Sequence, residues 1–233
     1  MTKIKICGLM EPEHALAVAG AGADFIGMVF SQPSRRFISP QQGAEIARAV
    51  RSAFPSDGQP TIVGVFVNET ADAMNKIADA CGLDMVQLSG DEPWELCRDL
   101  KRPVIKAVRM REGQEYADLE RELKSGLSNF VDQGSLCLLE PVVPGQYGGT
   151  GHKVDWALAK HVVGLYSFLL AGGLTPENVA EAVRAVSPWG VDVSSGVESD
   201  GVKDVEKIRR FIQEVRRADA KPANSALSHR AIS

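Results

Sequence analysis

Ile62-Val63-Gly64-Val65-Phe66-Val67 is the stretch of sequence that decides the fold of this 233-residue chain. It is apolar at nearly every position, so a strand formed there is buried on both faces, as the strands of parallel sheets are. Similar short runs recur along the chain, and helical or loop segments separate them. The predicted strands are 3–7, 25–30, 61–67, 84–88, 103–108, 136–140, 168–170 and 190–193.

The spacing of these strands is typical of repeated strand–helix units. The first and the last begin at residues 3 and 190, which gives about 27 residues per unit, enough for a strand and a crossover helix. Units of this kind form either a closed (β/α)8 barrel or an open doubly wound sheet. We favour a single (β/α)8 TIM barrel, because no Gly-x-Gly-x-x-Gly follows the first strand and glycine-rich loops follow the last strands instead.

Local signals indicate where helices begin and where the domain ends. Ser39-Pro40 and Thr175-Pro176-Glu177 each offer a capping side chain followed by proline, which predicts a helix start. Near the C-terminus, apolar residues recur at helical spacing at 205, 208, 211, 212 and 215. The remaining residues show no apolar period. We therefore expect residues 1–217 to form the barrel and 218–233 a disordered tail.

Composition and charge exclude several classes of partner. The chain has 26 Lys plus Arg against 30 Asp plus Glu and contains no basic run, which argues against nucleic acid or an anionic membrane surface. No stretch approaches the roughly 20 apolar residues of a membrane span, and the N-terminus does not predict a secretory signal. Four scattered cysteines without Cys-x-x-Cys indicate a cytoplasmic protein, and the histidine spacing predicts no metal site.

Candidate catalytic residues lie where strands end, because (β/α)8 barrels carry their active sites at the carboxyl ends of the strands. Cys7 ends the first predicted strand, and Glu140 ends the sixth. A thiolate can act as a general base, although such a cysteine also suits the role of a small buried apolar residue. Glu140 is a lone acid that equally suits a helix cap. The glycine-rich residues 148–151 beside it would suit a lid.

Candidate binding residues follow other strands. Arg35 and Arg36 follow the second strand, where one guanidinium facing the barrel mouth would suit a carboxylate or phosphate, unless both belong to a solvated loop. The loops after strands seven and eight are built of small residues with free backbone N–H groups, an arrangement that favours phosphate binding over simple tight turns. These loop residues are Gly172 and Gly173 in the first loop, and Ser194, Ser195 and Gly196 after Asp192 in the second.

Six motifs together resemble those of the phosphoribosylanthranilate isomerase family. They occur in that family's order, and the resemblance spans residues 3 to about 217. The motifs are Lys-Ile-Cys-Gly-Leu at 5–9, Ser-Arg-Arg-Phe-Ile-Ser-Pro at 34–40, Val-Gln-Leu-Ser-Gly-Asp-Glu at 86–92, Gly-Gly-Thr-Gly at 148–151, Ala-Gly-Gly-Leu-Thr-Pro-Glu-Asn-Val at 171–179 and Val-Asp-Val-Ser-Ser-Gly-Val-Glu at 191–198.

The resemblance implies a cofactor-free Amadori rearrangement in tryptophan biosynthesis, which converts N-(5-phosphoribosyl)anthranilate to 1-(2-carboxyphenylamino)-1-deoxyribulose 5-phosphate. It implies that Glu140 matches the acid that opens the furanose ring and that Cys7 matches the base that removes the sugar C2 proton. Arg36 matches the residue that holds the anthranilate carboxylate, and Asp192 one that contacts the substrate near the anthranilate nitrogen. The small residues after strands seven and eight match the phosphate loops.

Two positions depart from the family pattern: Glu140 stands where the family usually has aspartate, and Ser89 where it usually has histidine. The longer side chain could misplace the acid by about 1 Å, and an error of that size can cost about 100-fold in rate. A non-catalytic phosphosugar-binding relative is therefore the alternative. The related sugar isomerase of histidine biosynthesis would need aspartate at the position of Cys7.

Overall fold

The computed structural model describes residues 1–32, 34–111, 113–127, 134–142, 155–163 and 166–220. Parallel strands pair in chain order, and β8 pairs with β1 to close a barrel. The strands are β1 (Lys3–Cys7), β2 (Phe25–Val29), β3 (Thr61–Phe66), β4 (Met85–Leu88), β5 (Val104–Met110), β6 (Leu136–Pro141), β7 (Phe168–Leu170) and β8 (Gly190–Val193). This closed order confirms the predicted TIM barrel and excludes the open sheet.

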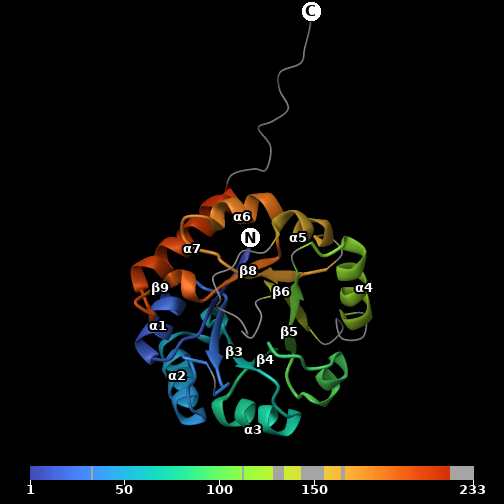
Figure 1. The fold of residues 1–233 in the computed structure, drawn as a ribbon. Coiled ribbons are helices and arrows are strands. Elements are labelled where there is room, and N and C mark those ends of the chain that lie inside the picture. Colours follow the sequence, from blue (N-terminus) through green and yellow to red (C-terminus); the bar gives the residue numbers. More distant parts are fainter. Residues whose placement is uncertain (33, 112, 128–133, 143–154, 164–165, 221–233) are drawn as a thin grey trace, which may run out of the picture.

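Helices surround the barrel as an outer ring (Figure 1). They are α1 (Pro12–Gly20), α2 (Pro40–Ala53), α3 (Ala71–Cys81), α4 (Tyr116–Leu127), α5 (Trp156–Val162), α6 (Val179–Val186) and α7 (Val205–Ala220). A 3-10 helix, η2 (Trp94–Asp99), follows β4, and η4 (Ser195–Val197) follows β8 and leads into a small hairpin of β9 (Glu198–Ser199) and β10 (Val202–Lys203). None of the helices within the described residues is long and apolar enough to cross a membrane.

The two helix starts predicted from Ser39-Pro40 and Thr175-Pro176-Glu177 can be compared with the structure. Ser39 caps α2 in a reciprocal capping box with Gln42. Thr175 caps the turn before α6 as predicted: its hydroxyl accepts from the Glu177 backbone N–H at 3.2 Å, and the Asn178 side chain accepts from the Thr175 backbone N–H at 2.8 Å. Asn178 also donates to the Gly173 carbonyl, and the regular helix begins at Val179.

The C-terminal helix extends past the boundary predicted at residue 217. Helix α7 runs to Ala220, Ala218 is buried, and Asp219 accepts two hydrogen bonds from Thr2, one from the backbone N–H at 2.8 Å and one from the hydroxyl at 2.6 Å. The beginning of the predicted tail is therefore an ordered part of the barrel. The rest of that tail, 221–233, lies outside the described residues.

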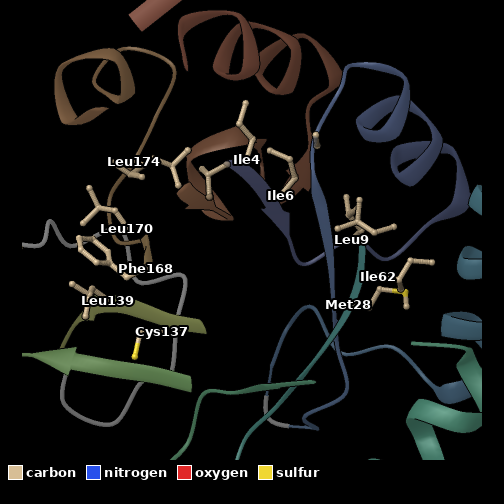
Figure 2. Close-up of a cluster of buried hydrophobic side chains, with 14 of the residues drawn as sticks. Ile4, Ile6, Leu9, Met28, Ile62, Cys137, Leu139, Phe168, Leu170 and Leu174 are labelled. Carbon is tan, nitrogen blue, oxygen red and sulfur yellow. The ribbon is translucent and has the colours of Figure 1, made fainter. Parts of the chain in front are cut away.

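Alternation along each strand divides the core in two. In β1, Ile4 and Ile6 face the helices and pack in the outer core (Figure 2). Lys5 and Cys7 face the barrel interior, where inward-facing residues of the other strands fill the space. One apolar cluster of this interior comprises Phe25, Val63, Met85, Ile105, Ala107, Leu138, Leu169 and Ala171, and Val29 and Val65 form another with Cys7. Polar inward-facing side chains are concentrated towards the carboxyl ends of the strands.

Candidate active site

Cys7 lies at the barrel mouth beside a fully buried ammonium group. Lys5, two residues earlier on the same strand face, donates a hydrogen bond from Nζ to Asp192 Oδ1 at 2.8 Å and also interacts with the Cys7 thiol. Opposite them on β2, a Cβ on Gly27 would lie only 2.8 Å from Cys7 Sγ and 3.2 Å from Lys5 Nζ. The absence of a side chain at Gly27 therefore makes room for this pair.

The pKa values of these groups are set by burial and by their mutual charges. Burial raises the pKa of the Cys7 thiol, and the Lys5 ammonium opposes that rise by favouring the thiolate. Burial alone would lower the pKa of Lys5, but the charges of Asp192 and Cys7 and the hydrogen bonds to them together outweigh burial and raise the pKa. Lys5 therefore stays protonated, and Asp192 is its counter-ion.

Glu140 lies at the end of β6, opposite Arg109 on β5. The Arg109 Nε is 3.7 Å from Glu140 Oε1, which accepts no hydrogen bond from the described residues. Burial raises the pKa of Glu140 to about 7, although the Arg109 charge works in the opposite direction. A carboxyl with such a pKa exchanges protons near neutrality, as a general acid needs. Arg109 itself donates to the Ser89 carbonyl at 2.6 Å.

Arg36 extends across the turn that follows β1, and Arg35 points outward. A Cβ on Gly8 would overlap Arg36 Cδ and would lie 3.1 Å from Ser194 Oγ. Gly8 has a φ of +79°, a conformation that favours glycine. The side chain of Arg36 is 10% exposed and that of Arg35 is 53% exposed. Of the two arginines, Arg36 is therefore the buried one, beside Gly8.

The loops after β7 and β8 are in direct contact. A Cβ on Gly196 would overlap the Leu174 carbonyl oxygen, and both Gly172 and Gly173 adopt positive φ, at +92° and +60°. Ser194 Oγ donates to the Cys7 carbonyl at 3.0 Å, which joins the β8 loop to β1. Ser195 begins η4, so Gly196 lies in a tight turn built of short residues.

The structure therefore brings Cys7, Arg36, Asp192 and the β8 loop to one end of the barrel. Ser89, which stands where the family usually has histidine, accepts a hydrogen bond on its hydroxyl from the Gln87 amide at 2.9 Å. The glycine-rich residues 148–151, predicted to suit a lid, lie outside the described residues.

Four charged residues at this end had no role in the sequence interpretation: Lys5, Arg109, Glu198 and Lys203. A signal existed for Lys5, because a lysine two residues before Cys7 in a buried strand must face the same side. Glu198 ended a quoted motif, but the partners that define its role come from distant parts of the chain.

The fold and the polar end of the barrel define a (β/α)8-barrel enzyme. The family model for N-(5'-phosphoribosyl)anthranilate (PRA) isomerase matches residues 4–214. A curated relative of that name from Roseiflexus castenholzii is 51% identical over 220 residues, covering 92% of this chain and 98% of the relative. The chain belongs to the N-(5'-phosphoribosyl)anthranilate isomerase family.

Solved structures agree with this assignment. The phosphoribosyl anthranilate isomerase of Thermotoga maritima is 37% identical, with a TM-score of 0.78, over 93% of this chain and 100% of that one. A phosphoribosyl anthranilate isomerase in complex with reduced 1-(o-carboxyphenylamino)-1-deoxyribulose 5-phosphate has a TM-score of 0.74 at 35% identity, over 93% of this chain and 100% of that one.

Proposed function

We propose that this chain converts N-(5'-phosphoribosyl)anthranilate to 1-(2-carboxyphenylamino)-1-deoxyribulose 5-phosphate, with Glu140 as general acid and Cys7 as general base. The observation that carries the proposal is the pairing of two ionisable groups at one barrel end, a carboxyl with a pKa of about 7 and a thiol beside a buried ammonium. Glu140 on β6 and Cys7 on β1 can act separately, as acid and as base. This suits a reaction in which the substrate first gains a proton and then loses one.

The reaction divides into two proton transfers. Glu140 donates its proton to the furanose ring oxygen, the bond from C1 to that oxygen breaks, and the nitrogen lone pair forms a Schiff base. The Cys7 thiolate then removes the C2 proton, and the electrons of that bond neutralise the iminium nitrogen to give an enamine. Tautomerisation of the enamine yields the ketose. No electrons leave the substrate, so this chemistry is an internal redox exchange between C1 and C2.

The direct test is an isomerase assay. Purified protein is added to freshly prepared phosphoribosylanthranilate, and the decay of the substrate fluorescence is followed. Turnover above the spontaneous rate supports the proposal. Substrate binding without turnover would instead favour the non-catalytic phosphosugar-binding relative, for which Glu140 and Ser89 are the motivation.

Lys5 is the residue that keeps the Cys7 thiol ionisable, so its charge is expected to control thiol reactivity. In the double variant Lys5→Met/Asp192→Asn, which removes both buried charges together, the pKa of Cys7 should rise. Each unit of that rise lowers the thiolate fraction near neutral pH about tenfold. The measurement is the pH dependence of alkylation by iodoacetamide, with Cys7→Ser as the blank.

Lys3→Met is the matched control for this experiment. Lys3 lies two residues before Lys5 on the same strand, but its side chain is 45% exposed and pairs with Asp24 at 2.7 Å. Its removal should leave the alkylation profile of Cys7 unchanged. An unchanged profile in the Lys5 variant as well would show that Lys5 does not tune the thiol.

The substrate phosphate is expected to bind between the loops after β7 and β8, held mainly by backbone N–H groups. In Gly196→Ala, the new methyl group would push the two loops apart at Leu174. The affinity for inorganic phosphate, measured by calorimetric titration or competitive inhibition, should fall about tenfold or more, which corresponds to about 1.4 kcal/mol.

The control for the loop variant is Gly20→Ala at the end of α1, where the nearest atom to a new Cβ is Phe54 Cζ at 3.8 Å. This variant should bind phosphate as the wild type does. Equal phosphate affinity in Gly196→Ala would place the phosphate elsewhere.

We also propose that the enzyme works in the cytoplasm. The support is that all four cysteines are free and buried, as thiols are in a reducing compartment.

A further inference from the structure

Glu198, the first residue of β9, is surrounded by cations. Its side chain is only 5% exposed. Arg36 donates to both of its carboxylate oxygens, from Nε to Oε1 at 2.7 Å and from Nη2 to Oε2 at 3.2 Å. Lys203 Nζ donates to Oε1 at 2.8 Å, and Arg35 Nη2 forms a further ion pair with Oε2. One buried carboxylate thus holds three basic side chains.

Two of these cations lead to two neighbouring parts of the candidate active site, the turn after β1 and the loop after β8. Arg36 lies over Gly8, directly after Cys7, and was predicted to bind the substrate carboxylate. Lys203 Nζ donates to the Ser194 backbone carbonyl at 2.8 Å and so fixes the loop predicted to bind phosphate. Glu198 therefore connects the residue expected to bind one anionic group of the substrate with the loop expected to bind the other.

We propose that Glu198 is a positioning residue that fixes Arg36 and the Ser194 loop relative to each other, so that a ligand with a carboxylate and a phosphate is held at both ends. This inference rests on the proposed function and names a residue to which that function gives no role. Glu198 itself does not contact the reacting atoms. It acts through Arg36 and Lys203.

The opposite interpretation is that Glu198 occupies the place of the substrate carboxylate on Arg36 and competes with it. The contacts argue against this. Glu198 takes the Nε and Nη2 edge of the guanidinium, and Arg36 Nη1 makes no hydrogen bond to the described residues. Glu198 is also held by Lys203, and its backbone carbonyl accepts from Lys207 Nζ at 2.8 Å. It is therefore fixed and leaves one edge of Arg36 for a ligand.

The charge balance of the cluster supports anion binding. One carboxylate faces two buried cations, Arg36 and Lys203, so the buried part of the cluster keeps a net positive charge without the exposed Arg35. Burial would raise the pKa of Glu198, but the hydrogen bonds from Arg36 and Lys203 outweigh burial and lower the pKa to about 2. Glu198 is thus ionised near neutral pH and keeps its ion pairs there.

The test measures each end of the site with its own probe. Anthranilate reports on Arg36, and inorganic phosphate reports on the Ser194 loop, each through its inhibition constant in the isomerase assay. In Glu198→Gln both constants should rise about tenfold, and the KM of the substrate should rise more than kcat falls, because the lost interaction is equal in the ground and transition states. Arg36→Met should weaken anthranilate binding and leave phosphate binding unchanged.

Arg35→Gln is the matched control, because Arg35 contacts the same carboxylate from the solvent side. It should leave both inhibition constants within twofold of wild type. Unchanged constants in Glu198→Gln would overturn the inference, and tighter anthranilate binding would establish competition instead. A wild type without isomerase activity would refute the proposed function, whereas an active wild type with an unaltered Glu198→Gln variant refutes this inference alone.

A second variant keeps the inference testable if Glu198→Gln does not fold, which circular dichroism would reveal. Lys203→Met removes the link to the Ser194 loop and leaves the pairing of Arg36 with Glu198 in place. It should weaken phosphate binding about tenfold with little change for anthranilate. Equal phosphate binding in this variant would exclude the proposed coupling through Lys203.

Discussion

Replacing Cys7 with serine is expected to lower kcat about 10²- to 10⁴-fold, the range that general acid–base groups contribute. A serine hydroxyl hardly ionises near neutral pH, even with the Lys5 ammonium beside it, so the group that takes the C2 proton is lost. The side chain keeps nearly the same size in a buried position, and the barrel should remain folded. Steady-state kinetics and circular dichroism on the same preparation measure both effects.

Cys81→Ser is the matched control for this variant. Cys81 is also buried, and its thiol donates to the Pro40 carbonyl at 3.1 Å, a bond that a serine hydroxyl can replace. Its kcat should stay close to that of the wild type. Near wild-type turnover in Cys7→Ser would remove Cys7 from the mechanism.

Glu140→Gln is expected to lower kcat by a similar factor, because an amide cannot donate a proton to the furanose oxygen. The matched control is Glu181→Gln on the exposed surface of α6, which should be fully active. If Glu140→Gln retained most of the activity, another group would open the ring. Glu140→Asp has no expected direction, because aspartate is the usual family residue but the backbone here carries the longer side chain.

The same variant is expected to be more stable than the wild type at alkaline pH. The pKa of Glu140 is raised to about 7 from its ordinary value of 4.5, so the folded state binds a proton that the unfolded state releases between these values. Stability therefore falls as pH rises from 4.5 to 7, and the loss is complete above 7, on the order of 3 kcal/mol. Glu140→Gln should remove that loss at pH 8 and make little difference at pH 4. Urea unfolding at both pH values measures it.

The pH profile of kcat/KM follows from the same groups. The proposed reaction needs Glu140 protonated and Cys7 ionised at the same time. This arrangement exists only when Glu140 and Cys7 together hold one proton. Below about pH 7 both groups are protonated, and above the raised pKa of Cys7 both are ionised. We therefore expect a bell-shaped profile whose acidic limb lies near pH 7.

The sequence was sufficient for the barrel because its strands are short, apolar and buried on both faces, and their order along the chain is their order in the sheet. Cys7 and Glu140 were predicted as catalytic residues because each lies where a strand ends. The ion pairs of Lys5 and Glu198 were not predicted, because their partners are far away in the sequence. Asp192 is 187 positions from Lys5, and Arg36 is 162 positions from Glu198. The alternation of residues along a strand predicts the face on which a side chain lies. It does not predict which side chain of another strand it contacts.

The start of α6 shows a local signal that was right in kind. Thr175 caps the turn as predicted: its hydroxyl accepts from the Glu177 backbone N–H, and Asn178 accepts from the Thr175 N–H in return. The regular helix begins only at Val179, and the Asn178 side chain also ties this turn to the Gly173 carbonyl, a contact that residue types alone do not reveal.

The closure of β1 against β8 has a consequence for biosynthesis. Cys7 is translated well before β8, because the counter-ion of Lys5 and the loop that bonds to the Cys7 carbonyl come 187 positions later than their partners. During synthesis the thiol has no complete environment, and a nascent chain that lacks β8 cannot form the charge pair. Catalytic competence therefore requires β8 and helix α7 to be in place, and two hydrogen bonds from Thr2 to Asp219 join α7 to the start of β1.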